Sequence, residues 1–406
     1  MHPDTMRLID RWVGIPLCFL ASLWPWGKFK SIYQQQLKTN PFYPQTIVFI
    51  CVSEIGALVV AYPAIKEARK KFPKSRICFI TAPAGLEALE LMGFNKEDVF
   101  LLETNSVKRL IKGIFNLRKF IEGGKISAII LEPFVRFSTL LSAWIGASQR
   151  VGYHRFKNEG AYLGNLLTHR LVYNSHLHAS QTYFSLTKAL MEKKSKEPLL
   201  KVYVPSQIKN RLMINVSEKE KKNLITKLKD ECKSITLKKI ILLNANASDI
   251  VPLRKWPIEK FVVLGKKLIE SPDFNVVLTG NKNEKKICED LAKKINPEKV
   301  INFAGKTSFK ELIALYSISN LLITNDSGPV HFASTTNIPI VALFGPETSK
   351  IFGPMSPKAR VISMGLSCSP CITVFNQKKS ACTDNQCMKK ISVEMVVNEI
   401  KKVLKK

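Results

Sequence analysis

The N-terminal part of the sequence lacks an apolar run long enough to cross a membrane. The apolar segment from Val13 to Trp26 spans about fourteen residues and contains Pro16 and Pro25, whereas a membrane-spanning helix needs roughly 20. The segment also lacks a clear small-x-small cleavage site, although Arg7 and Arg11 precede it as in a signal peptide. We therefore expect neither a transmembrane helix nor a secreted protein.

Two interpretations of this segment remain open. As a helix in the membrane interface, it would hold Trp24 and Trp26 at headgroup level beside Lys28 and Lys30. Alternatively, it packs on the protein's own surface. The first interpretation predicts a cytoplasmic protein in peripheral contact with the inner membrane.

Acidic residues are scarce. The 62 Lys and Arg outnumber the 32 Asp and Glu and leave a net charge of +30, which favours polyanionic partners such as nucleic acid, anionic lipids or phosphorylated glycolipids. The lysines are dispersed and lack the interleaved aromatic residues of a nucleic-acid surface. We expect no nucleic-acid partner. The alternative is a basic nucleic-acid-binding protein with a four-cysteine zinc site, which would bind in a salt-sensitive way.

The length and the element pattern indicate two α/β domains. A chain of 406 residues exceeds one ordinary core, and strands such as Thr46 to Val52 alternate with helices of about ten to fifteen residues, as in a parallel sheet covered on both faces. The alternation stops in a charged stretch and then restarts. We predict an N-terminal extension (1–44), a Rossmann-like domain (45–205), a charged helical linker (206–238), a second Rossmann-like domain (239–390) and a C-terminal helix (391–406).

The segment Thr324-Asn-Asp-Ser-Gly-Pro-Val-His331 combines a strand end, a polar turn and a helix start. Ser327 or Asp326 suits the cap and Pro329 suits the first helical turn. The backbone amides and positive end of such a helix suit a diphosphate. An ordinary capped turn without a ligand is the alternative, because Asp-Ser-Gly is common in turns.

This segment, followed by Pro339-x-Val-Ala-Leu-Phe-Gly-Pro346, resembles the signature of glycosyltransferase family 9, the heptosyltransferases of lipopolysaccharide synthesis. The resemblance covers roughly residues 45 to 400. Further matching features are Gly56 with Pro63 and Ala64, Arg150-Val-Gly-Tyr-His-Arg155, Arg254-Lys-Trp-Pro257, Leu278-Thr-Gly280 with Glu284, and Ala304-Gly-Lys-Thr307.

The resemblance implies the GT-B fold, in which two facing Rossmann-like domains with parallel sheets form a cleft. It implies a metal-independent, inverting glycosyltransferase that requires no cofactor and transfers a sugar, heptose from ADP-heptose by expectation, to a phosphorylated lipid-linked saccharide such as the lipopolysaccharide core. The donor-binding residues it implies are Arg254, Lys255, Glu284, Thr324, Asp326, Ser327, Gly328 and His331. Arg254 or Lys255 would neutralise the diphosphate, and Glu284 would accept hydrogen bonds from the ribose. On the acceptor side it implies Gly56, Arg136, His154 and Arg155.

The catalytic base departs from the family pattern. The family usually has Asp directly after the loop glycine, and here Ala57 occupies that position. Glu54 lies on the same turn and is the predicted base, although it also suits a helix-capping role. The alternatives are Glu132 or a non-catalytic protein that binds the nucleotide sugar. An Asp-x-Asp metal motif is absent.

Four cysteines crowd near the C-terminus: Cys368-x2-Cys371, then ten residues, then Cys382-x4-Cys387. Two close pairs of thiolates can hold Zn²⁺ or an iron-sulfur cluster, so a structural metal site is predicted. Disulfides and free thiols remain alternatives. By the resemblance, this cluster is a structural loop outside the reaction centre.

Overall fold

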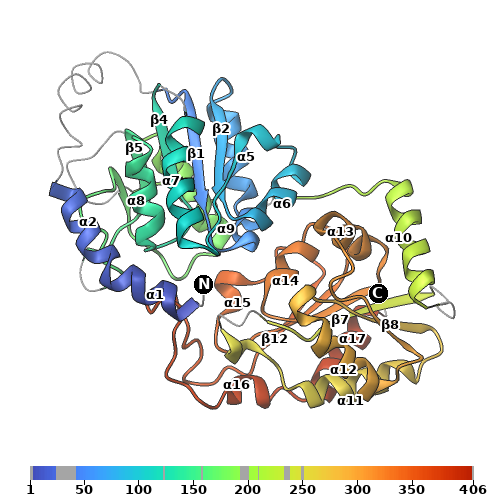
Figure 1. The fold of residues 1–406 in the computed structure, drawn as a ribbon. Helices are drawn as coiled ribbons and strands as arrows, with labels where there is room; N and C mark the ends of the chain where they lie inside the picture. Colours follow the sequence, from blue (N-terminus) through green and yellow to red (C-terminus); the bar gives the residue numbers. More distant parts are fainter. Residues whose placement is uncertain are drawn as a thin grey trace. The chain divides into compact units, whose positions relative to one another are not determined.

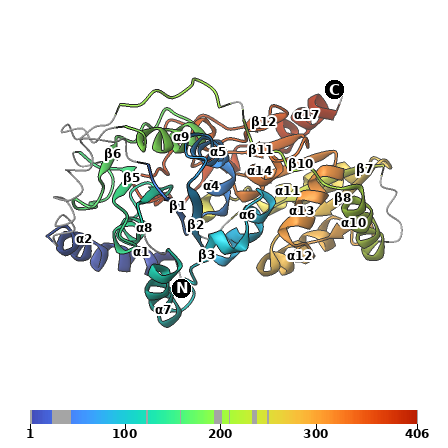
Figure 2. The same cartoon turned by 90° about the horizontal axis from the view of Figure 1, so that it is seen from above.

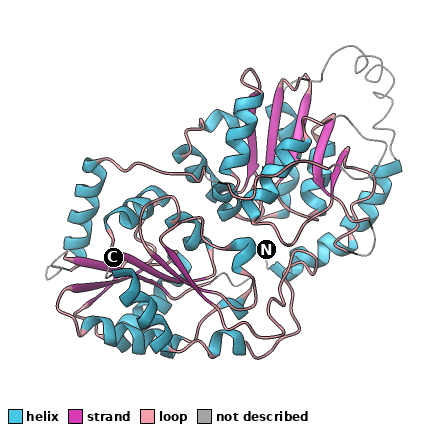
Figure 3. Ribbon diagram, turned by 180° about the vertical axis from the view of Figure 1, so that it is seen from behind, coloured by secondary structure: helices cyan, strands magenta, loops and turns pink. Residues whose placement is uncertain are grey.

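The computed structural model describes residues 3–23, 43–121, 124–156, 159–192, 201–208, 210–232, 238–247 and 251–404. The chain divides into two compact units, Met1–Asn210 and Arg211–Lys406, and each contains one sheet flanked by helices (Figures 1 and 3). Among the described helices, none has the length and hydropathy to cross a bilayer.

The first unit contains a six-stranded parallel sheet in the order β3-β2-β1-β4-β5-β6. Its strands are β1 (Thr46–Cys51), β2 (Arg76–Thr81), β3 (Val99–Leu101), β4 (Ile126–Ile130), β5 (Gln149–Tyr153) and β6 (His169–Leu171). In β1 every residue is buried, because helices cover both faces of the sheet and a central strand has no solvent side.

The helices of this unit lie in the connections between its strands, apart from the N-terminal pair and α9, which follows the last strand. They are α1 (Pro3–Trp12), α2 (Gly14–Leu23), α4 (Ile55–Val60), α5 (Tyr62–Lys71), η1 (Pro83–Gly85), α6 (Leu86–Leu91), η2 (Lys96–Asp98), α7 (Val107–Phe120), α8 (Arg136–Trp144) and α9 (Ala179–Ala189). Helix α2 packs on α8, where Cys18 is buried against Ala143 and Leu166.

The second unit repeats the same strand order, β12-β11-β10-β7-β8-β9, with parallel pairing throughout. Its strands are β7 (Lys239–Asn244), β8 (Phe274–Leu278), β9 (Val300–Asn302), β10 (Leu321–Asn325), β11 (Ile340–Leu343) and β12 (Ala359–Ile362). Its helices are α10 (Glu218–Glu231), η3 (Pro252–Arg254), α11 (Ile258–Ile269), η4 (Lys282–Glu284), α12 (Lys285–Ile295), α13 (Phe309–Ile318), α14 (Gly328–Ala333), α15 (Ser349–Phe352), α16 (Gln386–Lys389) and α17 (Val393–Leu404). Both sheets have the Rossmann order, which places a ligand crevice beyond the strands' carboxyl ends.

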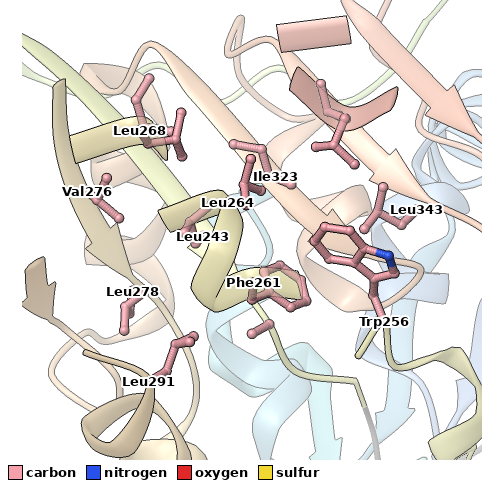
Figure 4. Close-up of a cluster of buried hydrophobic side chains, with 14 of the residues drawn as sticks. Leu243, Trp256, Phe261, Leu264, Leu268, Val276, Leu278, Leu291, Ile323 and Leu343 are labelled. Carbon is pink, nitrogen blue, oxygen red and sulfur yellow. The ribbon is translucent and has the colours of Figure 1, made fainter. Parts of the chain in front are cut away.

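The core of the second unit lies between its sheet and the helices α11, α12 and α17 (Figure 4). Trp256 is 2% exposed, meets the Phe261 ring edge-on at 4.8 Å, and donates from Nε1 to the Ile391 carbonyl at 3.0 Å. The apolar face of α17 contributes Val396 and Ile400 to the same cluster. The C-terminal helix is therefore part of this core.

Helix α10 also belongs to the second unit. It begins at a capping box in which Ser217 and Glu220 exchange hydrogen bonds, and its buried Leu224 and Leu228 lie on the side that packs against α13. Lys227 forms an ion pair with Glu311 of α13 at 2.7 Å.

Candidate functional site

The carboxyl ends of three adjacent strands, β7, β10 and β11, gather polar side chains in the second unit. Strand β10 ends at Asn325, and Asp326 and Ser327 form the turn into α14. Glu347 follows β11 at the same edge. Parallel strands bring these segments together because their carboxyl ends share one edge of the sheet.

Arg254 lies between two buried carboxylates at this edge. Its Nη1 is 3.4 Å from Glu347 Oε2 and 3.9 Å from Asp326 Oδ2, and the three side chains are 12%, 2% and 3% exposed respectively. The buried Nε of Arg254 makes no hydrogen bond to any described residue. A guanidinium with a donor to spare in a buried setting suits recognition of a phosphate or carboxylate oxygen.

Burial, together with the negative charge of Glu347, raises the pKa of Asp326 to about 8 against the lowering effect of Arg254 and Lys378. Asp326 is therefore mostly protonated at neutral pH, because two carboxylates this close to one cation cannot both ionise cheaply in a buried site. Lys378 supplies a second cation to this region and lies over the Phe352 ring at 5.2 Å.

Two side-chain amides, the buried Asn325 and the half-buried Asn385, hold the Arg254 loop in place. Asn325 accepts from the Trp256 backbone N–H at 3.1 Å and donates to the Ala245 carbonyl at 3.0 Å. From the other side, Asn385 donates to the carbonyls of Leu253 at 2.9 Å and Lys255 at 3.2 Å. These contacts fix the backbone on both sides of Arg254. Sequence reasoning assigned a role to neither asparagine.

The remaining residues of the Thr324 to His331 segment lie in and below the turn. Thr324 is fully buried, and its hydroxyl donates to the Asn325 carbonyl at 3.0 Å. Ser327 is the residue before α14, and Gly328 is its first residue. Gly328 lies so close to Phe332 that a Cβ at this position would be 2.9 Å from the phenylalanine ring. His331 is the fourth residue of α14. This helix has only six residues. Its free backbone amide groups therefore contribute more to anion binding than its dipole does.

Glu284 lies beside the same edge but already has a structural contact. Its Oε2 accepts from the Asn281 backbone N–H at 2.7 Å and completes a capping box. Gly280 sits where a Cβ would lie 3.0 Å from both Glu284 Oε2 and Asn246 Nδ2. This glycine therefore lets Glu284 approach the segment that follows β7.

The corresponding edge of the first unit carries two acids of different character. Glu132 is 6% exposed and accepts hydrogen bonds from the Ser53 backbone N–H at 2.7 Å and from the hydroxyls of Ser53 and Ser138. Glu54 is exposed and precedes α4 as its N-cap residue. Both acids affect the buried Tyr183. Its pKa is raised mainly by burial, next by the charge of Glu54 and least by that of Glu132.

Within α4, Gly56 is half-buried and Ala57 is 8% exposed. Ala57 offers only a methyl group at the position where the family pattern has a carboxylate. Of the two candidate bases, Glu54 is exposed to solvent, whereas Glu132 accepts hydrogen bonds from three donors.

Arg136 and Arg155 lie together in the first unit. They line one cavity of about 560 Å³ with apolar residues of α2 and the loop before β6. The Arg136 guanidinium is 5% exposed, donates to the Tyr162 carbonyl at 3.0 Å, and pairs with Asp10, whereas Arg155 lies over the Tyr162 ring at 5.4 Å. Arg155 is consequently the more available cation of the two.

His154 is neutral at physiological pH. Burial, together with the positive charges of Arg170 and Arg155, lowers its pKa to about 4. Its Nδ1 is buried and makes no hydrogen bond within the described residues. A neutral imidazole of this kind can donate to or accept from a ligand but adds no charge to anion binding.

The predicted metal site gains no support. The described residues contain no group of three or more His, Cys, Asp or Glu arranged to hold a metal ion, and Cys368, Cys371, Cys382 and Cys387 are all free thiols. Burial raises the pKa of Cys387, with smaller contributions from the other three sulfurs. The loop instead packs under the turn before Glu347, where the Cys371 N–H donates to the Pro346 carbonyl at 3.0 Å.

Two parallel sheets with the Rossmann order confirm the predicted α/β fold and define the structural class. Residues 114–381 match the model of glycosyltransferase family 9 (heptosyltransferase), and the chain belongs to this family. It is similar to lipooligosaccharide heptosyltransferase 2 of Campylobacter jejuni, with 31% identity over 169 residues, which cover 41% of this chain and 52% of the relative. The chain thus spans about half the length of that relative.

Two solved structures are also similar. One is the ADP-heptose lipopolysaccharide heptosyltransferase II of Escherichia coli, with TM-score 0.65, 22% identity, and coverage of 88% of this chain and 98% of the other. The second is a family 9 glycosyltransferase from Veillonella parvula, with TM-score 0.66, 22% identity, and coverage of 90% and 98%. These similarities confirm the predicted GT-B fold.

Proposed function

We propose that this protein is an inverting, metal-independent glycosyltransferase that transfers heptose from ADP-heptose to a phosphorylated, lipid-linked saccharide such as the lipopolysaccharide core. The observation that carries the proposal is the buried Arg254, held between Asp326 and Glu347 at the carboxyl edge of a Rossmann-like sheet. Family membership and the names of the relatives support heptose as the sugar and ADP as the donor nucleotide.

In the proposed donor complex, Arg254 binds the diphosphate together with the amides around Ser327 and Gly328, and Lys378 adds a second positive charge. The protonated state of Asp326 supports this role, because it leaves the Arg254 guanidinium with less competing negative charge. Thr324 is fully buried, so we assign it to shaping the turn.

Three further residues complete the proposed donor site. Glu284 accepts from the ribose hydroxyls, and His331 and Lys255 lie at its margins. Departure of the nucleoside diphosphate is then stabilised by positive charge and backbone donors, as a reaction without a catalytic metal requires.

Glu54 is the proposed base. Its carboxylate takes the proton from the acceptor hydroxyl while that oxygen bonds to the anomeric carbon and the bond to the departing ADP breaks. Glu132 holds Ser53, the residue before Glu54, and so positions the turn that presents the base. Ala57 favours one competing function, a nucleotide-sugar-binding protein without catalysis.

The acceptor is proposed to be an anionic glycolipid at the cytoplasmic face of the inner membrane, so the protein would act as a peripheral membrane enzyme. Arg155 would bind an acceptor phosphate, with His154 and Gly56 beside it. Arg136 is engaged by Asp10, and we assign it to fixing the wall of the cavity.

Calorimetric titration with ADP and ADP-heptose, followed by transfer assays, tests the proposal. Arg254→Ala should abolish donor binding, while Glu54→Gln should leave it intact and lower kcat by roughly 10²–10⁴-fold. Glu90→Gln, which removes an exposed carboxylate on α6, is the matched control and should behave as wild type. Donor binding without turnover by the wild type would establish the non-catalytic alternative, and absence of donor binding would overturn both.

A further inference from the structure

The N-terminal helices present an apolar surface to solvent. Trp12 is 70% exposed, Phe19 52%, Leu20 59% and Leu23 66%. Helix α2 is apolar on all sides, and only Gly14 and Cys18 within it are buried. A soluble protein rarely leaves so many large apolar side chains together in water without a partner for them.

The opposite side of the same helices is firmly attached to the first unit. Cys18 is fully buried against Ala143, and the Asn165 N–H donates to Ser22 Oγ at 2.8 Å. On α1, Asp10 pairs with the buried Arg136 of α8. The apolar surface is thus fixed in position.

Helix α7 carries a second exposed apolar stripe. Val107, Ile111 and Phe115 recur every fourth residue and are 58%, 50% and 61% exposed. Lys108 and Lys112 are exposed along the edge of this stripe. The sequence of α7 contains five basic residues and no acidic one, which is the composition of helices that bind anionic membrane surfaces.

Both apolar surfaces adjoin the C-terminal end of α8. The Phe115 ring meets Trp144 edge-on at 5.5 Å, and Trp144 Nε1 donates to the Ile114 carbonyl at 2.7 Å. The preceding residue, Ala143, packs against Cys18 of α2. Figure 2 shows α2, α8, α1 and α7 along one side of the first unit. We call the exposed apolar and basic side chains of α1, α2 and α7 the docking face.

We propose that the docking face binds an anionic lipid bilayer. Its apolar side chains enter the interfacial region, and Lys108 and Lys112 lie at the level of the lipid phosphates. The net charge of +30 favours the same partner, and the ten-residue α2 is too short to cross a bilayer. The inference rests on the membrane contact of the proposed function and names the surface that makes it.

Co-sedimentation of the full-length protein with vesicles tests this without donor or acceptor. Wild type should bind vesicles of equimolar phosphatidylcholine and phosphatidylglycerol more tightly than pure phosphatidylcholine, and less tightly as salt rises. The paired changes Leu20→Asn with Leu23→Asn, and Lys108→Glu with Lys112→Glu, should each lower the partition coefficient at least about ten-fold.

Two matched changes on the second unit serve as controls: Val263→Asn, at an apolar residue that is 44% exposed, and Lys286→Glu, at an exposed lysine. Both should bind vesicles as wild type does. Since all substituted side chains are exposed, melting temperatures should remain unchanged, and ADP binding by calorimetry should persist in every variant.

Equal vesicle binding by wild type and the paired variants would overturn the proposal. So would a loss of self-association in those variants without a change in lipid binding, which would identify a second copy of the chain as the occupant. Either failure would leave ADP binding, and therefore the donor site, unaffected.

Discussion

Replacing Asp326 by Asn should make the protein's stability less sensitive to pH. Burial raises the pKa of Asp326 from 3.8 to about 8. Between these pH values the folded protein keeps a proton that the unfolded chain has lost. Folding therefore takes up a proton in this window, and stability falls as pH rises through it.

The size of the effect follows from the width of the window. Each pH unit inside it costs the wild type about 1.4 kcal/mol, so stability should fall by roughly 3 kcal/mol between pH 5 and 7.5 relative to Asp326→Asn. An amide of the same shape has no proton to release. The variant also alters the contact with Arg254, but that change shifts the curve without giving it this slope.

Urea unfolding, monitored by pulse proteolysis at several pH values, measures the stability of wild type and of Asp326→Asn. The fragments of the second unit should be resolved separately. Asp290→Asn, which removes an exposed carboxylate on α12, is the matched control and should stay within about 0.5 kcal/mol of wild type at each pH. A constant difference between Asp326→Asn and wild type from pH 5 to 7.5 would refute the reasoning.

Two further predictions concern buried polar groups. Asn325→Ala should destabilise the second unit by about 2–4 kcal/mol, because it leaves the Trp256 N–H and the Ala245 carbonyl without their bonds; urea unfolding should show a much smaller effect for the exposed Asn283→Ala. His154→Gln should leave the pH profile of kcat/KM unchanged between pH 6 and 8, because the His154 pKa of about 4 lies below that range. A shifted profile would assign His154 a protonated role.

The central strands of both sheets were predictable from sequence, because strands buried on both faces are continuous apolar runs. The predicted strand Thr46 to Val52 corresponds to β1 (Thr46–Cys51). Strand β5 and the edge strands β6 and β12 were missed. Strand β12 has two exposed residues among its four, so it carries no apolar run to detect.

The candidate site was predictable only where one segment of sequence contains it. Arg254 and Asp326 belong to recognisable motifs. Glu347 directly follows the motif that ends at Pro346, and it was missed although the pairing of β10 with β11 brings their carboxyl ends together. Lys378 and Asn385 come from the cysteine-rich segment, where no local pattern relates them to β10. Only the tertiary fold shows these contacts.

The two units use different side chains to hold the segment that follows their first strand. In each unit the fourth strand pairs with the first, β4 with β1 and β10 with β7. A polar side chain near the carboxyl end of the fourth strand forms a hydrogen bond with the segment that follows the first strand. In the first unit Glu132 does this by accepting from Ser53. In the second unit the tie is Asn325, which donates to Ala245.

This difference has a chemical consequence. Because an amide makes the tie in the second unit, the neighbouring Asp326 carboxyl is left to face Arg254. In the first unit the Glu132 carboxylate accepts these hydrogen bonds itself, and the exposed Glu54 is the proposed proton acceptor. The same strand order thus places a buried guanidinium at the edge of one unit and an exposed carboxylate at the edge of the other. We propose these two groups for anion binding and for proton transfer in the reaction.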